Sequence, residues 1–179
     1  MDLRHPLGKW PARRIALLAL FSALAHVGRL IFAFIPNVQP MSALLLLISV
    51  YLGLTDGLIV TVLSLVLSNL FLGFGPWTVH QIVAYSGVLL ILTPLLRWTP
   101  YRWLRSLEAG AMGMMYGWFI SLLFVWSYQI NHFWAYYLRG VPFDLNHALG
   151  NIVFYFLLEP IVLRILPRKV PHFNKRSSG

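Results

Sequence analysis

Apolar residues fill most of the chain in long runs, which short segments rich in glycine, proline or polar residues separate. A helix needs about 20 mostly apolar residues to cross the hydrocarbon core of a bilayer. Runs of this length, without the alternation of a half-buried strand, predict transmembrane helices. We therefore expect helices over residues 15–34, 78–96, 107–128 and 145–166.

The stretch from Met41 to Leu72 is too long for a single crossing. It holds 32 residues and one charged side chain, Asp56. At 1.5 Å per residue, one helix of this length would extend about 48 Å, well beyond a hydrocarbon core of roughly 30 Å. The sequence GLTDG at Gly53–Gly57 predicts a break, with Thr55 or Asp56 as the N-cap of the second half. This gives two further short helices and six in total.

The positions of the basic residues support six crossings, because cytoplasmic loops are enriched in Lys and Arg. Six crossings place both termini on one side, and that side then holds twelve of the fourteen basic residues. Only Arg29 and Arg139 fall on the other side. The expected fold class is an all-α membrane protein, one domain over residues 1–179, with both termini cytoplasmic. Its basic N-terminus covers about residues 1–14 and its basic tail about residues 168–179. The twelve residues are Arg4, Lys9, Arg13, Arg14, Arg97, Arg102, Arg105, Arg164, Arg168, Lys169, Lys175 and Arg176.

The composition points to the same class of protein. The chain is 59% hydrophobic and 11% charged, whereas a soluble domain is nearer one half and one quarter. The net charge of +9 does not indicate nucleic-acid binding, because the charges cluster at the ends of apolar runs. The chain has no cysteine, which excludes disulfides and thiol chemistry.

Polar and aromatic side chains gather in the three segments expected to face outward, residues 35–40, 73–77 and 129–144. The second lies within Ser68–Gln81, SNLFLGFGPWTVHQ, where amides, glycines and an imidazole interrupt the apolar pattern. Such groups suit an uncharged or weakly charged ligand that carries a ring. The alternative is an aromatic belt at the membrane surface with polar helix caps. The candidate substrate-binding residues are Arg29, Asn37, Gln39, Asn69, Trp77, His80, Gln81, Tyr85, Tyr128 and Asn131.

Arg29 lies near the end of the first expected helix, on the side that is poor in positive charge. An arginine deep in hydrocarbon costs about 2.5–3.5 kcal/mol on insertion scales. Its side chain should therefore face protein, water or a ligand, or else extend to the membrane surface. The sequence leaves both alternatives open.

Two expected helices carry stripes of small residues, which let helices approach closely in lipid. The first helix has Ala12, Ala16, Ala19 and Ala23 on one face. The fifth has Ala109, Gly113, Gly117 and Ser121, each four residues apart. For the fifth helix we expect packing within the bundle. For the first, a partner protein is an open alternative.

The titratable residues indicate no catalytic or metal site. The chain has five acids, Asp2, Asp56, Glu108, Asp144 and Glu159, and three of them fall at or near expected helix ends. Glu159 lies inside the last helix, where Arg164 could pair with it. The six histidines show no ligand spacing, and no phosphate-binding glycine loop is present. We expect no enzyme activity in this chain.

The six short spans, the sequence ALFSA at Ala19–Ala23 and the stretch Ser68–Gln81 together resemble the substrate-binding S component of an energy-coupling factor vitamin transporter. The resemblance covers essentially all six spans. Its more specific part is the pattern Asn-x-Phe-x-Gly-x-Gly-Pro-Trp-Thr-x-x-Gln after a serine-rich third helix, and FIPNVQP at residues 34–40 supports it.

This resemblance implies a prokaryotic plasma-membrane protein that binds a vitamin from outside, in a pocket closed by the loops after helices one, three and five. The vitamin is the transported ligand, and no cofactor is implied. The implied partners are a membrane T component and two ATPase subunits, which hydrolyse the ATP. The alanine face of helix one, Ala16, Ala19 and Ala23, would dock onto the T component. His80 departs from the pattern, because related segments often have a bulky aromatic residue there.

The nature of the vitamin follows less directly. The outer segments carry almost no fixed charge, which disfavours a multiply charged ligand, and IPNVQP with GPWT looks most like S components for cobalamin or its precursor cobinamide. Riboflavin and pantothenate are the alternatives. A different class of protein is a membrane scaffold without a small-molecule ligand. A stand-alone secondary transporter is disfavoured, because the sequence shows neither related halves nor an acidic relay at mid-membrane.

Overall fold

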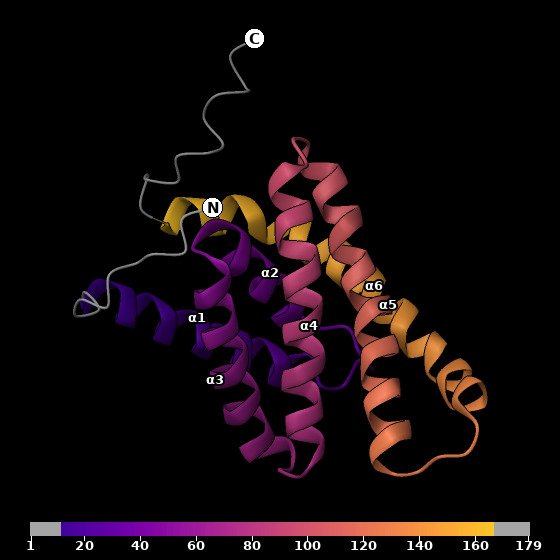
Figure 1. The fold of residues 1–179 in the computed structure, drawn as a ribbon. Helices are drawn as coiled ribbons and strands as arrows, with labels where there is room; N and C mark the ends of the chain where they lie inside the picture. The colour runs from indigo at the N-terminus through magenta and orange to yellow at the C-terminus, as the bar shows by residue number, and fades with distance from the viewer. Residues whose placement is uncertain (1–11, 167–179) are drawn as a thin grey trace.

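The computed structural model of the chain describes residues 12–166, which form six helices and no strand (Figure 1). The all-α fold class predicted from the sequence is therefore confirmed for this part of the chain. The basic segments before residue 12 and after residue 166 lie outside the described residues. The helices are α1 Ala12–Ile31, α2 Met41–Tyr51, α3 Leu54–Leu72, α4 Trp77–Trp98, α5 Arg102–Ser127 and α6 Phe133–Ile165.

Five of the described helices are long and apolar enough to span a membrane, and α2 is not. With 11 residues, α2 is about 16 Å long, roughly half of a hydrocarbon core. All of its side chains are buried, because α1, α3, α4 and α6 pack around it. The sequence predicted the break after α2 correctly. A sixth crossing would require the segment 32–40, which has no regular helix, to supply the remaining length.

Gly53 produces the break between α2 and α3. Its φ of 135° is a backbone conformation that other residues rarely adopt. The expected capping role of Thr55 or Asp56 is wrong, because α3 begins at Leu54 and no side chain caps it. Asp56 lies in the first turn instead, where its carboxylate pairs with Arg14 at 2.5 Å.

The last helix begins earlier than its sequence suggests. Residues 129–144 were expected to form a connecting segment, but α6 starts at Phe133 and only residues 128–132 join it to α5. Pro142 lies inside α6, where it would ordinarily end a helix. In a membrane a helix can continue through proline, since neighbouring helices re-satisfy the freed backbone groups. Here α5 packs along α6 through this region.

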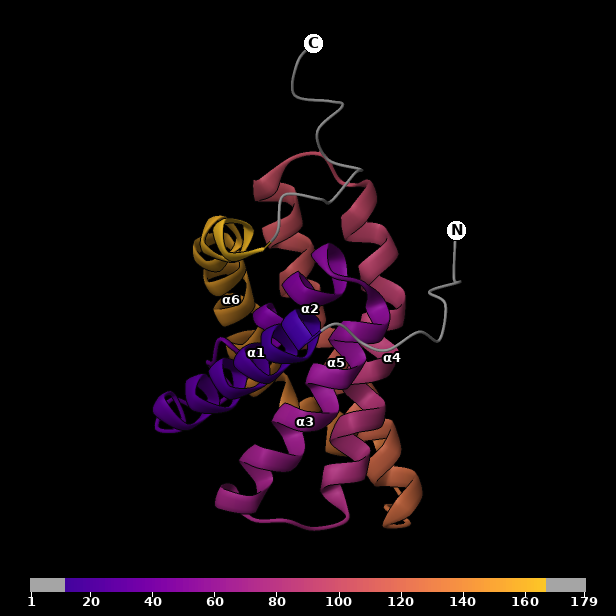
Figure 2. The ribbon, with the colours of Figure 1, turned by 90° about the vertical axis from the view of Figure 1, so that its left-hand side faces the viewer.

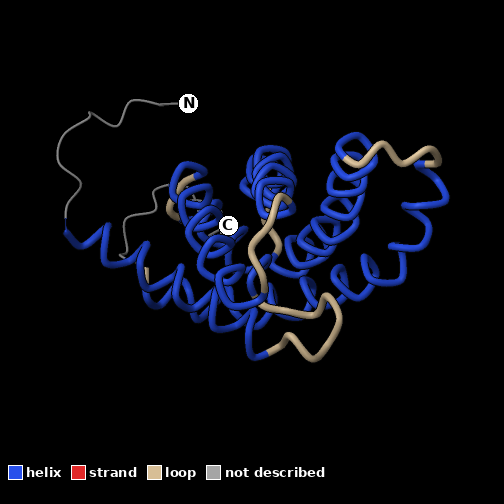
Figure 3. The backbone as a smooth tube through the Cα atoms, turned by 90° about the horizontal axis from the view of Figure 1, so that it is seen from below, coloured by secondary structure: helices blue, strands red, loops and turns tan. Residues whose placement is uncertain are grey.

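The helices form an upright group crossed by two others. Figures 1 and 2 show α3, α4 and α5 upright and α1 crossing α3 at a steep angle. α6 slants behind α5 and changes direction toward its C-terminal end, and it stays one continuous helix although Pro142 and Pro160 lie inside it. The connections α3–α4 and α5–α6 lie at one end of the bundle, which faces the viewer in Figure 3. We call this end the turn end, defined by residues 73–76 and 128–132.

Arginine side chains join the helices at the opposite end, which we call the basic end and define by Arg14, Arg97, Arg102 and Arg105. Arg97 donates hydrogen bonds to the carbonyl oxygens of Ser49 and Val50, at the end of α2. Arg105 pairs with Glu159 at 2.8 Å, whereas the sequence suggested Arg164 as the partner of this acid.

Candidate functional site

Five polar side chains from three helices form a hydrogen-bonded cluster near the turn end, which we call the amide network. Asn69, on the last turn of α3, is its centre. The Arg29 guanidinium of α1 donates to the side-chain oxygens of Ser68 at 2.6 Å and Asn69 at 3.1 Å. The Asn69 amide in turn donates to Thr78 at 2.9 Å and Gln81 at 2.8 Å, both on α4.

The amide network settles the alternatives left open for Arg29. Its guanidinium faces protein rather than the membrane surface, because it binds Ser68 and Asn69 inside the bundle. Three predicted site residues, Arg29, Asn69 and Gln81, therefore lie together. Ser68 and Thr78, which the sequence prediction did not include, complete the network and are both buried.

The GFGP turn positions Asn69 and Gln81 against each other. Gly73 has a φ of 111°, which lets α3 end and the chain reverse into α4 within four residues. The Trp77 indole lies over Gly75, where any Cβ would collide with the ring. Its N–H donates to the Gly73 carbonyl at 3.2 Å, and the side chain is 41% exposed. Trp77 therefore holds the turn, and its indole N–H binds the Gly73 carbonyl and not the amide network.

A second group of polar side chains lies deeper in the bundle, one helical turn along α4. Tyr85 is buried, and its ring stacks on Tyr116 of α5 with centroids 4.2 Å apart. Its hydroxyl lies 3.2 Å from the hydroxyl of Ser42 on α2, which lies 2.6 Å from Nε2 of His147 on α6. The ring of Tyr116 also lies near the ring of His147, with centroids 5.5 Å apart, so this group continues inward from Gln81 to α6.

α6 contributes a polar stripe that the sequence prediction missed. Its members are spaced by three or four residues, so they share one face of the helix. All of them are at most 5% exposed. The stripe consists of Asp144, His147, Asn151, Tyr155 and Glu159.

Every member of the α6 stripe except Glu159 has a polar atom without a hydrogen-bond partner. Buried atoms without a hydrogen-bond partner include Oδ2 of Asp144, Nδ1 of His147, both amide atoms of Asn151 and the hydroxyl of Tyr155. Buried polar groups normally have partners, so several consecutive exceptions on one helix face call for an explanation. Such atoms are available to a ligand, to water or to a proton.

The sequence carried a signal for this stripe. The sequence predicts a last helix that begins at Leu145 and places Asp144 near a helix end, so the helical spacing of Asp144 with His147 and Asn151 does not enter that prediction. The structure places Asp144 inside α6, which makes the expectation for this acid wrong. The pattern Asp-x-x-His-x-x-x-Asn in an apolar run indicates one polar helix face.

Glycines bring α5 against the polar face of α6. A Cβ at Gly117 would overlap the Asp144 carboxylate, and one at Gly113 would overlap the backbone of His147 and Ala148. The small-residue stripe of α5 is therefore internal packing, as the sequence analysis expected. Its members Ala109, Gly113, Gly117 and Ser121 are all buried.

The segment 32–40 covers the interior of the bundle between α1 and α2. Val38 packs on Gly150 of α6, next to Asn151, and Pro40 packs on Gly28 of α1. Two predicted site residues, Asn37 and Gln39, lie on this segment and are partly exposed. The segment is thus positioned as a cover over the α6 stripe.

The remaining predicted site residues lie apart from the amide network. His80 contacts α5 at the surface, where its Nε2 lies 2.7 Å from the Ser127 hydroxyl and its ring lies near Phe124 and Tyr128. Asn131 is exposed in the connection before α6. Either these residues act as an outer surface of the site or they belong to the aromatic belt.

The alanine face of α1 points away from the bundle. Ala12, Ala16, Ala19 and Ala23 are exposed, whereas Ala25 on the other side of the helix is fully buried. The two small-residue stripes therefore differ. The α5 stripe packs inside the chain, and the α1 stripe is free for another surface.

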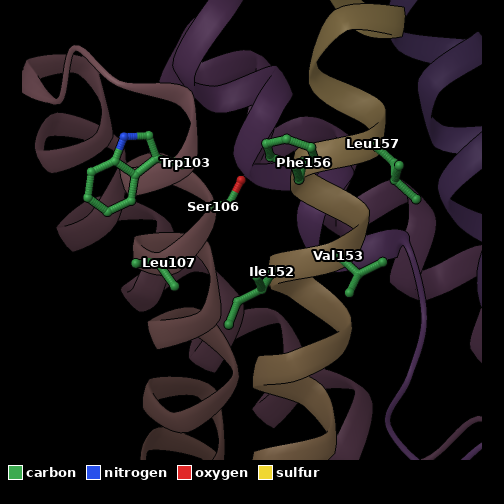
Figure 4. Close-up of a pocket in the computed structure, with 7 residues that line it drawn as sticks. All are labelled: Trp103, Ser106, Leu107, Ile152, Val153, Phe156 and Leu157. Atoms are coloured by element: carbon green, nitrogen blue, oxygen red, sulfur yellow. The ribbon is translucent and has the colours of Figure 1, made fainter.

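A separate apolar hollow lies between α5 and α6 near the basic end (Figure 4). It has a volume of about 360 Å³, and Arg102 lies beside it, over the Phe156 ring. Its lining is almost entirely apolar and shares no residue with the amide network or the α6 stripe. The lining residues are Trp103, Ser106, Leu107, Ile152, Val153, Phe156 and Leu157.

The site can bind a polar ligand by hydrogen bonds, and its residues offer no set of metal ligands. Among the described residues, no three His, Asp or Glu side chains gather around one point. Comparison with known proteins gives one match, the family DUF6580, described as a family of unknown function, over residues 9–172. No curated protein and no solved structure matches the chain.

Proposed function

This chain belongs to the DUF6580 family, and we propose that it is the substrate-binding S component of an energy-coupling factor transporter. In this role it binds a vitamin from outside the cell and delivers it to the cytoplasm. A membrane T component and two ATPase subunits supply the energy. The chain itself is a transport subunit of a prokaryotic plasma membrane and not an enzyme.

The observation that carries the proposal is the amide network and its inward continuation. Arg29, Asn69 and Gln81 are linked by hydrogen bonds, and Tyr85, one turn beyond Gln81 on α4, reaches His147 of the α6 stripe through Ser42. A membrane scaffold needs no such arrangement, because buried polar groups in a bilayer are costly unless they serve a purpose. Polar groups that converge between helices are typical of a ligand site.

Two further features support the proposal. The exposed alanine face of α1 offers a flat surface on which a partner helix can pack closely. The segment 32–40 and the turn 73–76 both adjoin the polar interior, as the closing loops of a vitamin pocket would.

The proposed orientation places the basic end in the cytoplasm, following the positive-inside rule. The chain passes from the basic end to the turn end along α1 and returns through segment 32–40 and α2. It then alternates through α3, α4, α5 and α6, so both termini share the cytoplasmic side. In this arrangement α2 and segment 32–40 together make one crossing.

For the vitamin we propose cobalamin or cobinamide, with riboflavin or pantothenate as alternatives. Cobinamide and cobalamin present many uncharged amide groups, which pair well with the amides of Asn69, Gln81 and Asn151. The carboxylate of pantothenate would meet Arg29 favourably, but pantothenate presents fewer amide groups to Asn69, Gln81 and Asn151, which makes it the weaker alternative.

Calorimetric titration of the purified chain in detergent tests the proposal. Cobalamin, cobinamide, riboflavin and pantothenate are each added without ATPase subunits. We expect one of them to bind, and we expect Asn69→Ala and Gln81→Ala to weaken that binding at least tenfold, about 1.4 kcal/mol. Asn146→Ala, an exposed amide on α6, is the matched control. A folded sample that binds none of the four contradicts the proposal and favours a scaffold.

One observation favours a second candidate, a transporter coupled to an ion gradient. Asp144 and His147 are buried ionisable residues inside the bundle, where such residues often mark ion or proton pathways. Uptake into lipid vesicles that contain the chain alone distinguishes an S component from an ion-coupled transporter. Uptake driven by a pH gradient without ATP or partner subunits would favour the second candidate.

A further inference from the structure

Asp144 and His147 lie one turn apart on the buried face of α6, and each has an unused atom. The carboxylate Oδ2 and the imidazole Nδ1 are both buried without a hydrogen-bond partner. The side chains are 5% and 2% exposed. Residues three apart on a helix are neighbours on its surface, so the two groups can share a proton through one water.

No cation among the described residues pairs with Asp144. The salt bridges of this part of the chain involve Asp56 and Glu159. The Arg29 guanidinium is occupied by Ser68 and Asn69. An isolated carboxylate inside an apolar bundle is costly to keep ionised, and it becomes neutral when it takes up a proton.

The other titratable groups around the pair do not neutralise it. Those facing the interior are Tyr85 of α4 and Tyr116 of α5, with Arg29 of α1 beyond them. Further along are Tyr137 of α6 on one side, and on the other Tyr155, Tyr51, Arg105 and Glu159 at the basic end. The phenols are neutral donors, and Arg105 is bound to Glu159.

The contacts of His147 determine which of its ring nitrogens carries the hydrogen. If Tyr85 donates to Ser42 and Ser42 donates to Nε2 of His147, the neutral imidazole carries its hydrogen on Nδ1. Nδ1–H then lies one turn from the Asp144 carboxylate. Gly117 keeps this place free, because any Cβ there would overlap the carboxylate.

We propose that Asp144 and His147 form a proton-binding site inside the bundle, which takes up one proton from solvent when it is empty and releases that proton to solvent when the substrate binds. The proton comes from solvent at the turn end, where Gln81 and the rest of the amide network lie. The second half of this statement rests on the proposed function, whereas the existence of the proton site does not.

Difference infrared spectroscopy of the full chain in lipid vesicles tests the proton site directly. The spectrum is followed from about pH 4 to pH 9, the range in which perturbed carboxyl and imidazole groups titrate. We expect a C=O stretching band of a protonated carboxyl that disappears with rising pH. The band should be absent in Asp144→Asn, should titrate at a different pH in His147→Gln, and should be unchanged in Asn146→Ala.

A second sample assigns the band to Asp144 even if the Asp144→Asn variant misfolds. The chain has three aspartates, Asp2, Asp56 and Asp144. In protein labelled with carbon-13 at the aspartate carboxyls, the titrating band should shift, and it should persist in the double variant Asp2→Asn and Asp56→Asn. A band that does not shift with the label, or is lost in the double variant, overturns the proton site.

Calorimetry of cobinamide binding in two buffers with different ionisation heats tests the exchange. We expect the measured heat to differ between the buffers in the natural chain and to become equal in His147→Gln. Equal heats in the natural chain overturn the coupling to substrate. If neither cobinamide nor another vitamin binds, the proposed function fails while the infrared result still decides the proton site.

Discussion

Gly117 shows how the absence of one side chain positions a buried acid. The helix α5 can lie close to α6 only because no Cβ stands between Gly117 and the Asp144 carboxylate. Gly140, on α6, has open space where its Cβ would be. The helix packing therefore requires glycine at position 117 and does not require it at position 140.

We predict that Gly117→Ala destabilises the protein and that Gly140→Ala does not. The added methyl group at Gly117 must displace Asp144 or separate the helices, which costs about 1–3 kcal/mol. At Gly140 alanine should be neutral or stabilise the helix by up to about 1 kcal/mol. Thermal unfolding in detergent measures both changes. An equal effect of the two substitutions would contradict the close packing of α5 on α6.

Asn151 offers a separate test of whether the unsatisfied atoms serve binding. Its amide is fully buried with neither group bonded. Replacement by leucine removes this unsatisfied amide, so we predict that Asn151→Leu is as stable as the natural chain or about 1–3 kcal/mol more stable. Binding of the vitamin should fall. Melting curves and calorimetry of the same sample report both, with Asn146→Leu as control. A large loss of stability would mean that the amide has a structural partner.

The sequence predicts individual site residues only where they interrupt an apolar pattern near a turn. Asn69 and Gln81 stood out because GFGP lies between them, and the structure joins them by a hydrogen bond. Asp144 and His147 did not stand out, because residues 129–144 were expected to form a connecting segment, whereas this region, Pro142 included, lies inside α6 from Phe133 onward. Proline is tolerated inside a membrane helix when neighbours pack around it, and that packing cannot be read from one local stretch.

At the scale of single helices, α1 and α5 show that the same sequence pattern can serve two purposes. Both carry small residues at helical spacing. Packing partners decide the difference, since α6 covers the stripe of α5 and no described helix covers Ala16, Ala19 and Ala23 of α1. The sequence left the question open for α1, and the structure identifies a free face.

We predict that bulky residues on the alanine face of α1 abolish transport without harming the fold. Ala19→Leu with Ala23→Leu should leave melting temperature and vitamin binding unchanged, because both side chains are exposed. Uptake in cells with the T component and ATPase subunits should be lost, because the partner can no longer approach. Ala25→Leu, at the fully buried position of the same helix, should instead lower the melting temperature.

Loss of vitamin binding in the Ala19 and Ala23 variant would show that this face packs inside the protein. Unchanged uptake would show that the partner docks elsewhere. Each outcome removes a different part of the proposed function.

A helix boundary could be predicted from the sequence where one residue determines it, and not where packing against other helices determines it. Gly53 ends α2 through its own backbone conformation, so the break was predictable. The start of α6 at Phe133 depends on contacts with α5, so it could not be predicted from the local sequence. α2 can be half as long as a spanning helix because four other helices surround it. The apolar run Met41–Tyr51 does not indicate these neighbours.

At the scale of the whole molecule, a charged network ties the helices together at the basic end. Glu159, 1% exposed at its side chain, accepts hydrogen bonds from Tyr51 at 2.5 Å and Arg105 at 2.8 Å. Arg105 also donates to the carbonyl oxygens of Thr99 and Pro100. This arrangement connects α2, α5, α6 and the α4–α5 connection.

We predict that Arg105→Ala lowers the free energy of unfolding by about 3–5 kcal/mol, because it leaves Glu159 as a buried, poorly compensated charge. Adding Glu159→Gln to Arg105→Ala should restore part of the loss. Arg139→Ala, an exposed arginine of α6, should change stability little. Chemical unfolding in detergent measures all three. A small effect of Arg105→Ala would mean that Arg102, 3.6 Å from Glu159, replaces it.

The orientation in the membrane can be tested with single cysteines, since the natural chain has none. We predict that Phe74→Cys, in the exposed turn between α3 and α4, reacts with a membrane-impermeant maleimide in intact cells. Tyr101→Cys, exposed at the basic end, should react only after the cells are opened. The reverse result would invert the proposed topology, and labelling of both in intact cells would contradict a membrane-spanning bundle.

The burial of α2 has a consequence for the order in which the protein is assembled. Three of the four helices that surround α2 follow it in the chain, so α2 leaves the ribosome before most of its surroundings exist. With half the length of a spanning helix, it gains too little from lipid to hold a place there alone. It is therefore expected to stay at the membrane surface or against α1 until α3, α4 and α6 have been inserted. A chain that stops before α6 is therefore expected to leave α2 without a stable position, and quality-control proteases should remove it.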